Sequence, residues 1–417
     1  MAHLIFKKHI SQYLSVPIKN SRYRYRVDLM KVPSNYGYYS SRVNRLYNED
    51  NFSSAVLDHI TKVFNFNVFD GHGGDNCAIY LKENLSKNIE NYIISQENID
   101  KLFKSYVKDI GGYWRRWYKK KDEKLNEIVN LIENWQKEEI NGENLFKLKI
   151  YMSFLETDYN FLLKDYNSKN HSGSTCTSCF LYTIDPDITN GGDESFFYEP
   201  NTLSKLIVAH CGDTRAILCD NQGLAHGLTV DHHPNNPVEN RRLTKYASNF
   251  LMTDSFGEER FVNFANTRSF GDINGKDKGI SAEPEFFEFI IGDTIKLQKY
   301  LKITNEQQKN SKILKNLKNF GGDECFLVLV SDGVTNCISD QEVVDIIMAT
   351  SNNKGLSKGT PQELAKQVVK FVECVGGDDN ATCNVIKLSG WGKWPLVDRT
   401  GKLRESKMMD DLKRLKN

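Results

Sequence analysis

The sequence predicts an α+β protein, because its 417 residues combine short strand-like apolar runs with segments that carry helix-start signals. The apolar runs are too short for independent helices, and most of them end at acidic residues next to glycine or asparagine. The four runs cover residues 64–69, 206–211, 325–330 and 381–388. We therefore expect several strands whose ends carry carboxylates.

Two segments in the C-terminal half carry clear signals for the start of a helix. Ser339 is followed three residues later by Glu342, which forms a capping-box pattern ahead of an apolar run. Thr360 and Glu363 repeat this pattern, and Pro361 stands where a helix does not need an amide donor. We expect this second helix to extend from Pro361 to about Cys374. Strands and helices are thus both predicted, but periodicity alone does not arrange them in layers.

The acidic residues at the strand ends predict a metal site. Candidate ligands follow or precede the apolar runs: Asp70-Gly71-His72, Asp213, Ser331-Asp332-Gly333, Gly377-Asp378-Asp379 and, upstream, Glu49-Asp50. Carboxylates and backbone carbonyls are the oxygen donors that hard divalent cations prefer. Acids that converge at one sheet edge repel one another unless cations neutralise them. The alternative for each residue is a turn cap, because Asp-Gly is also a common turn after a strand.

Composition is that of a soluble enzyme with no general affinity for nucleic acid or membrane. The formal net charge is +1, and 26% of the residues are charged. No apolar run approaches the ~20 residues that span a bilayer. Nine cysteines, an odd number, are scattered along the chain, which argues against a disulfide framework. Cys176 and Cys179 form a lone C-x-x-C on a strand-like run, so we expect them to point to opposite faces as buried thiols.

The ordered set of motifs resembles the type 2C metal-dependent serine/threonine protein phosphatases. The motifs are Arg45-Leu46-Tyr47-Asn48-Glu49-Asp50, Asp70-Gly71-His72-Gly73-Gly74, Ser172-Gly173-Ser174-Thr175, Gly212-Asp213-Thr214-Arg215-Ala216, Thr267-Arg268-Ser269-Phe270-Gly271-Asp272, Ser331-Asp332-Gly333 and Asp379-Asn380. The resemblance covers about residues 42–388. It implies a four-layer αββα sandwich of two mainly antiparallel sheets flanked by helices, with metals at one edge between the sheets. The chain also resembles a fungal mitochondrial branch of this family through residues 263–272 and Trp391-Gly392-Lys393-Trp394-Pro395.

The resemblance implies two divalent cations, Mn²⁺ or Mg²⁺, in each active site. Asp70 would bridge them, Asp332 and Asp379 would complete one shell, and Gly71, by its carbonyl, and Glu49 would serve the other. Asp50 would hold a metal-bound water. Asp213 matches a carboxylate that some members use, with Asp332, for a third and weaker metal. A metal-activated water would then attack phosphorus directly, with no phosphoenzyme.

Two further residues are expected to act on the substrate. Arg45 matches the phosphate-binding arginine of the family, and its planar fork suits two phosphate oxygens. His72 would protonate the leaving seryl or threonyl oxygen. The alternatives are a structural ion pair for Arg45 and a satisfied histidine for His72. His232 and His233 are interpreted as scaffold, and Asp272 is interpreted as a turn residue outside the metal set.

Three functions remain open at this point. The first is an active phosphatase of phosphoserine and phosphothreonine proteins. The second is a catalytically silent relative that acts as a scaffold, which loss of metal carboxylates would indicate. The third is a metal-dependent hydrolase of a small phosphorylated metabolite, which a deep closed pocket would favour. We expect a monomer that acts on phosphorylated proteins, and the resemblance makes a subunit of the pyruvate dehydrogenase complex a candidate.

The chain is expected to form one catalytic domain, residues 31–390, between two basic or charged ends. Residues 1–27 hold six lysines and arginines and no acid, which is typical of a mitochondrial presequence, and we assign residues 1–30 to this segment. Residues 391–417 are expected to be a charged tail. The alternative for the N-terminus is an ordinary basic arm in a cytoplasmic protein.

Two insertions into the catalytic domain are predicted. Residues 98–163 show helical spacing, with a packing stripe of Leu148, Met152, Leu155, Tyr159 and Leu162. Within this segment the run from Trp114 to Lys121 mixes aromatic and basic residues, which we interpret as inward tryptophans with solvated cations; a docking patch is the alternative. Residues 296–319 are rich in Lys and Asn, and we expect a partly mobile surface insertion.

Overall fold

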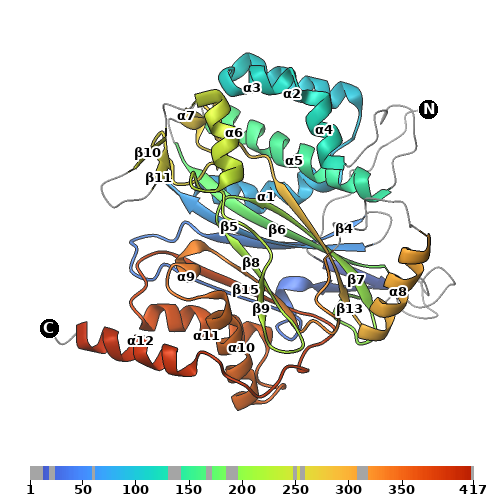
Figure 1. Cartoon of the computed structure of the whole chain (residues 1–417), viewed down its shortest axis with the longest axis vertical. Coiled ribbons are helices and arrows are strands. Elements are labelled where there is room, and N and C mark those ends of the chain that lie inside the picture. Colours follow the sequence, from blue (N-terminus) through green and yellow to red (C-terminus); the bar gives the residue numbers. More distant parts are fainter. Residues whose placement is uncertain are drawn as a thin grey trace.

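The computed structural model describes residues 13–17, 24–58, 62–129, 142–165, 171–184, 196–247, 251–253, 259–307 and 318–414. Two antiparallel sheets lie face to face at the centre of the molecule, and helices cover both outer faces (Figure 1). The predicted αββα sandwich is therefore confirmed. No helix within the described ranges is long and apolar enough to cross a membrane.

The first sheet has the strand order β13-β7-β6-β5-β4, and the short β12 pairs with β6. Its strands are β4 (Asn51–Asp58), β5 (Lys62–His72), β6 (Gly173–Thr183), β7 (Leu203–Cys211), β12 (Phe270–Gly271) and β13 (Glu285–Gly292). The second sheet has the order β3-β15-β14-β8-β9. Its strands are β3 (Tyr36–Ser41), β8 (Arg215–Cys219), β9 (Ala225–Gly227), β14 (Phe326–Val330) and β15 (Ala381–Lys387). Each predicted strand is present.

The alternation of side chains along the central strands builds three stacked apolar layers. On β5, Phe64, Phe66 and Val68 face the second sheet, where they pack in one cluster with Leu327 and Leu329 of β14. The other face of each sheet packs against helices. A strand places successive side chains on opposite faces, so both sheets are apolar on both sides. This arrangement buries the strand ends that carry the predicted ligands between two rigid sheets.

The cysteine motif follows the same rule. Cys176 lies in the cluster beneath the first helical layer, whereas Cys179 lies in the cluster between the sheets. Both thiols are buried, and their removal from water raises their pKa values above the usual range. The prediction of two buried strand cysteines on opposite faces is confirmed.

Helices α1 (Asn76–Asn91) and α5 (Gly142–Asp165) cover the first sheet, and α2 (Gln96–Asp109), α3 (Gly112–Tyr118) and α4 (Lys121–Val129) lie outside them (Figure 1). The described part of 98–163 is therefore helical, as predicted. Trp114 and Trp117 are buried against Leu148, Met152 and Leu155. The cations between and after the tryptophans are exposed: Arg115, Arg116, Lys119 and Lys120. The interpretation is confirmed for the two tryptophans and these four cations, but Lys121, the last cation of the predicted run, is only 11% exposed and pairs with Asp100.

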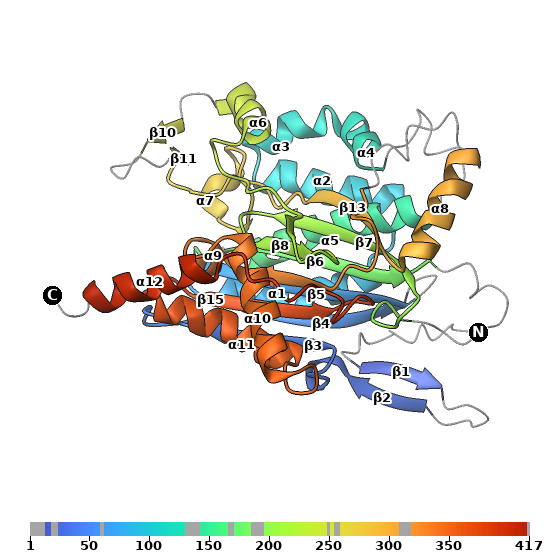
Figure 2. The same ribbon diagram turned by 60° about the horizontal axis from the view of Figure 1, so that its bottom comes forward.

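The second sheet is covered by α10 (Asp340–Lys354) and α11 (Pro361–Cys374). Ser339 and Glu342 form the predicted reciprocal capping box, and the Thr360 hydroxyl accepts a hydrogen bond from the Glu363 amide. The remaining helices are η1 (Leu29–Lys31), α6 (Pro237–Ala247), α7 (Ile273–Lys276), α8 (Thr294–Gln307), α9 (Asp332–Thr335) and α12 (Gly401–Arg414). Two small hairpins, β1 (Tyr13–Pro17) with β2 (Arg24–Asp28) and β10 (Leu251–Thr253) with β11 (Glu259–Phe261), complete the fold (Figure 2).

Two predictions about the periphery need correction. The predicted insertion 296–319 begins within helix α8, whose Leu297 is buried against Ile290 of β13. Residues 308–317 lie outside the described residues. The predicted tail from 391 is packed at its start, because Trp391 and Trp394 contact Phe326 edge-on, and it then forms α12. Most of the predicted presequence also lies outside the described residues.

Candidate active site

A cavity of about 580 Å³ opens at one edge of the sandwich. The predicted site residues that line it are Arg45, Glu49, Asp70, Gly71, His72, Asp213, Asp332 and Asp379. Asp50 lies behind them and is buried. The structure thus brings together all the residues that the sequence singled out, although they are spread over more than 300 positions.

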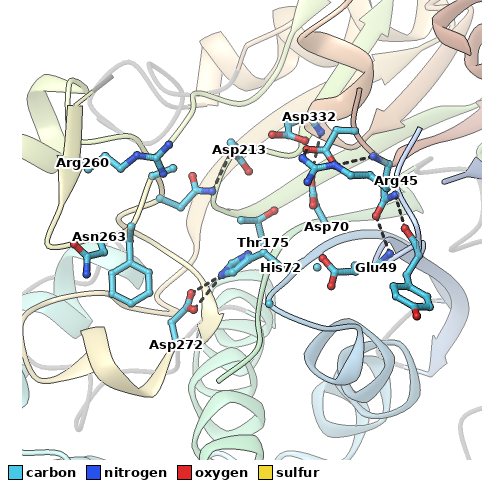
Figure 3. Close-up of a pocket in the computed structure, with 18 of the residues that line it drawn as sticks. Arg45, Glu49, Asp70, His72, Thr175, Asp213, Arg260, Asn263, Asp272 and Asp332 are labelled. Carbon is cyan, nitrogen blue, oxygen red and sulfur yellow. Dashed lines mark hydrogen bonds and ion pairs between the residues drawn. The ribbon is translucent and has the colours of Figure 1, made fainter. Parts of the chain in front are cut away.

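The cavity residues come from the ends of strands in both sheets. Asp70, Gly71 and His72 close β5, and Asp213 follows β7 in the same sheet. From the second sheet, Asp332 begins the short helix after β14, and Asp379 precedes β15 (Figure 3). Each carboxylate is therefore fixed by a strand with packed neighbours, which gives the site a rigid base.

Three carboxylates at the base of the cavity are held in an electrostatically unfavourable arrangement. Enclosure by the protein and the charge of Asp332 raise the pKa of Asp70 well above its usual range. Enclosure also raises the pKa of Asp332 to about 6, with a contribution from Asp213. Burial raises the pKa of Asp50 to about 7, although hydrogen bonds from Ser331 and Thr382 oppose this rise. A bound cation would remove this penalty.

The donor set fits a hard divalent cation. All the candidate donors are oxygens, and Asp50 Oδ1 is buried with no hydrogen-bond partner, while its Oδ2 accepts bonds of 2.7 Å from Ser331 and Thr382. Among the described residues, no three His, Cys, Asp or Glu side chains form a closed ligand set as placed. The fit therefore rests on the chemistry and charge of the donors.

Gly71 meets a steric requirement that the sequence did not reveal. A Cβ at this position would lie 2.4 Å from the carbonyl oxygen of Glu49. The Glu49 segment is held there because the Glu49 carboxylate accepts a hydrogen bond of 2.8 Å from the Gly74 amide. Glycine thus lets the two segments that carry candidate ligands touch, in addition to leaving its own carbonyl accessible.

His72 faces a carboxylate that sequence reasoning left out. Its Nε2 lies 2.9 Å from Asp272 Oδ2 (Figure 3). The Ser269 hydroxyl donates to the same oxygen. Burial alone would lower the pKa of His72, but the charge and hydrogen bond of Asp272 raise it above the usual value. Asp272 adopts a left-handed conformation with φ 53°. Its place at the end of the Arg268–Asp272 motif was the signal that could have identified it.

Arg45 is the most exposed cation among the predicted residues. Its side chain is 57% exposed, Nη2 lies 2.8 Å from Asp379 Oδ2, and Nε donates to the Asp378 carbonyl. The ion pair considered from the sequence is therefore present, and it orients the guanidinium at the mouth of the cavity. Asp379 and the Asp378 carbonyl bind one edge of the guanidinium, and the rest of the side chain stays accessible to a ligand.

Of the two histidines near Asp213, His233 interacts with the Asp213 carboxylate and His232 with the backbone. Burial would raise the pKa of Asp213, but the hydrogen bond and charge of His233 lower it. Asn266 also donates to Asp213, over 2.8 Å. His232 is buried, and its Nδ1 accepts from the Gly212 amide, which agrees with the predicted scaffold role. The lining residues to which the sequence assigned no role in the site include Thr175, Asn263, Phe264 and Asn266.

With the site described, comparison with known proteins identifies the family. The family model described as Protein phosphatase 2C matches residues 93–297 and 315–381. The chain belongs to this family. Protein phosphatase 2C homolog 4 of Schizosaccharomyces pombe is 31% identical over 390 residues, which are 92% of this chain and 87% of that protein. As a member of the protein phosphatase 2C family, the chain is a phosphatase and hence a hydrolase.

Other relatives of this phosphatase agree. Protein phosphatase 1K, mitochondrial, of Xenopus laevis is 26% identical over 93% of this chain and 77% of its own length. Two solved structures share the fold at 17% identity and a TM-score of 0.52. A sex-determining protein of C. elegans is matched over 89% of this chain and 67% of its own, and a Toxoplasma gondii phosphatase over 85% and 92%.

Proposed function

We propose that this phosphatase hydrolyses phosphoserine and phosphothreonine in proteins by direct attack of water, with two Mn²⁺ or Mg²⁺ ions in the cavity. The observation that carries the proposal is the group Asp50, Asp70 and Asp332, whose pKa values are all raised by burial and by neighbouring carboxylates. Arg45 supplies an accessible guanidinium beside them.

The metal roles that we propose are those that the family resemblance implies. Asp70 would be shared between the two ions, and Asp332 and Asp379 would serve one of them. The Gly71 carbonyl and Glu49 would serve the other ion, Asp50 would orient a water, and Asp213 would support a weaker third ion. When bound, such a pair of cations lowers the pKa of a water and neutralises charge on the phosphoryl oxygens.

The protein groups outside the metal set would handle the substrate. Arg45 would bind two oxygens of the phosphoryl group through its fork, which fixes the phosphorus for in-line attack. His72 would give a proton to the leaving seryl or threonyl oxygen, since a bare alkoxide is a poor leaving group. Asp272 would keep the imidazole oriented and would favour its protonated form. Burial of Asp272 beneath His72 makes it a positioning residue.

Two other functions fit the site less well. A silent scaffold would be expected to lack metal carboxylates, but Asp70, Asp332 and Asp379 are all in place. A hydrolase of a small metabolite would be expected to enclose its substrate, but Arg45 and Leu46 at the mouth are largely exposed. An accessible rim of this kind favours a macromolecular substrate.

We also infer a mitochondrial location and, within it, a phosphorylated subunit of the pyruvate dehydrogenase complex as a candidate substrate. The support is the basic, acid-free N-terminal segment and the relatives from Xenopus laevis and rice whose names include "mitochondrial". Mass spectrometry of the N-terminus of the protein isolated from cells tests the location. An intact Met1 would count against a cleaved presequence.

Release of phosphate from a phosphothreonine peptide tests the activity. The purified protein should release phosphate with Mn²⁺ or Mg²⁺, should lose the activity in EDTA, and should be insensitive to okadaic acid. The matched control is Leu396→Gln, a change of an exposed leucine that does not line the cavity. A metal-loaded protein without activity on any phosphopeptide would overturn the proposal.

A further inference from the structure

Two large apolar side chains stand in solvent at the mouth of the active-site cavity. Leu46 is 82% exposed and Tyr47 is 78% exposed, and both line the cavity next to Arg45. We propose that they form a subsite for an apolar side chain of the substrate, within two positions of the phosphorylated residue. The preferred substrates are then phosphoproteins with apolar residues beside the phosphoserine or phosphothreonine. This inference rests on the proposed function.

Leu46 and Tyr47 are exposed, but the backbone that carries them is held by hydrogen bonds on both sides. The Arg45 amide donates to the Arg42 carbonyl over 2.9 Å, and the Tyr47 carbonyl accepts from the Asn380 side chain over 2.9 Å. The Asn380 side-chain oxygen accepts in turn from the Glu49 amide over 2.8 Å. The backbone on both sides of the pair is therefore fixed against the second sheet, so Leu46 and Tyr47 are presented from a rigid base. A preformed surface of this kind loses little entropy when it binds a ligand.

The subsite is continuous with the site for the phosphoryl group. Leu46 and Tyr47 follow Arg45 by one and two positions, so their Cα atoms lie within about 8 Å of its Cα. Substrate residues within two positions of the phosphorylated one span the same ~8 Å. A phosphoryl group on the Arg45 fork thus brings the flanking side chains of an extended peptide over this pair.

The opposite wall of the cavity adds a second apolar group. Phe264 and Ala265 line it, and the Phe264 segment is held by backbone hydrogen bonds with Phe261 of 2.9 and 3.0 Å. On the Leu46 side, Arg45 is the lining cation, and the phosphoryl group would occupy it. Glu49 and Asp379 also line the cavity beside this pair, and their carboxylates disfavour acidic flanking residues, so the exposed apolar area favours apolar ones. Arg42, which donates to the Arg45 carbonyl, and Arg260 on the far wall make an acidic preference the rival outcome.

The size of the expected preference follows from the area that such a contact removes from water. Contact with a rim removes only part of an apolar side chain from water, so we expect about a five- to tenfold effect on kcat/KM. Apolar contact would act on binding, so most of the effect should appear in KM.

The test compares three phosphothreonine peptides of equal length on the Mn²⁺-loaded full chain. They carry Leu, Gln or Glu at the two positions on each side of the phosphothreonine. The wild type should hydrolyse the Leu peptide about five- to tenfold faster than the Gln peptide, in kcat/KM. The double variant Leu46→Gln/Tyr47→Gln should bring this ratio close to one. Because both peptides are measured on the same preparation, any inactive fraction cancels in the ratio.

Leu396→Gln is the matched control, because Leu396 is 86% exposed and does not line the cavity. It should keep the wild-type ratio. A wild-type ratio near one, a ratio that survives in the double variant, or a Glu peptide that is hydrolysed fastest would each overturn the inference while leaving the phosphatase intact. If no peptide is hydrolysed, the proposed function itself fails.

Discussion

Two clusters of carboxylates in this fold have pKa values that are shifted in opposite directions. In the cavity cluster, Asp50, Asp70 and Asp332, the pKa values are raised. In the buried cluster beneath α3 and α6, Glu239 and Glu283 have pKa values below the usual range. Both clusters are largely buried, so burial alone does not explain why their pKa values shift in opposite directions. The difference is that arginine side chains pair directly with Glu239 in the buried cluster, whereas the carboxylates of the cavity cluster mainly face other carboxylates.

The buried cluster is closed by its own partners. Glu239 accepts from Arg242 over 2.7 Å and from Arg268 over 2.6 Å. Glu283 accepts from Trp117 and Tyr151 over 2.7 Å each, and so ties helices α3 and α5 to the loop after α7. The carboxylates of Glu239 and Glu283 thus have cationic or hydrogen-bonding partners within the chain, so the cluster stabilises the fold. In the cavity cluster the like charges lack such ion pairs, which is the pattern expected of the metal site that we propose.

The largest effect expected from this contrast is that of Asp70→Asn on activity. Loss of the carboxylate that we propose the two ions share should lower kcat at least ~10³-fold, because it removes several kcal/mol of transition-state stabilisation. The same change should raise the free energy of unfolding in EDTA by about 1 kcal/mol or more, since it removes a like charge. Phosphate release and urea denaturation measure the two effects. A destabilised variant in EDTA would contradict the account of the cavity cluster.

The same chemical change in the buried cluster should have the opposite effect on stability. Glu239→Gln leaves Arg242 and Arg268 without their charge partner, so we expect a loss of about 3–5 kcal/mol in the free energy of unfolding. Urea denaturation in EDTA, side by side with Asp70→Asn, provides the comparison. Equal changes in the free energy of unfolding for Asp70→Asn and Glu239→Gln would show that the two clusters do not differ in how their charges are compensated.

Acid should remove the contribution of Glu283. Burial would raise its pKa, but the charges of Lys124 and Arg242 and the Tyr151 hydrogen bond lower it to about 2. A lowered carboxyl pKa stabilises the fold above the ordinary value of 4.5, and the stabilisation is lost as the pH falls from 4.5 towards 2. One pKa unit is about 1.4 kcal/mol, so up to ~3 kcal/mol is at stake.

The difference in unfolding free energy between the wild type and Glu283→Gln measures this contribution. It should be constant between pH 5 and 7 and should shrink as the pH is lowered from 4.5 to 2.5. A difference that stays constant over the acid range would mean that Glu283 is not held ionised by its partners.

The smallest effect concerns Asp272, which belongs to neither cluster. Asp272→Asn should lower kcat on a phosphothreonine peptide about 10- to 100-fold, a part of what a general acid contributes. On p-nitrophenyl phosphate, whose leaving group needs no proton, kcat should fall much less. KM should change little for either substrate. An equal loss on both substrates would show that Asp272 acts on structure and not through His72.

The strands and most helices could be predicted because their signals are local. The alternation on β5, the opposite faces of Cys176 and Cys179, and the capping box at Ser339 each follow from neighbouring residues. The convergence of Asp70, Asp332 and Asp379 could also be predicted, since carboxylates at strand ends share an edge once the strands pair. Their roles as ligands remain a proposal.

Contacts between distant segments could not be predicted. Asp272 looked like a turn residue because its partner, His72, lies 200 positions away and its left-handed turn leaves no periodic signal. Trp391 and Trp394 sit in a charged segment, yet they are held by Phe326 of β14. In both cases the deciding interaction is formed only when the sheets have paired.

Calorimetric titration with Mn²⁺ tests most directly the claim that the cavity carboxylates await a cation. The wild type should bind two Mn²⁺ ions per chain, and Asp70→Asn should lose binding of at least one of them, whereas Leu396→Gln should bind as the wild type does. Equal binding by the wild type and Asp70→Asn, or no binding by the wild type, would contradict the account.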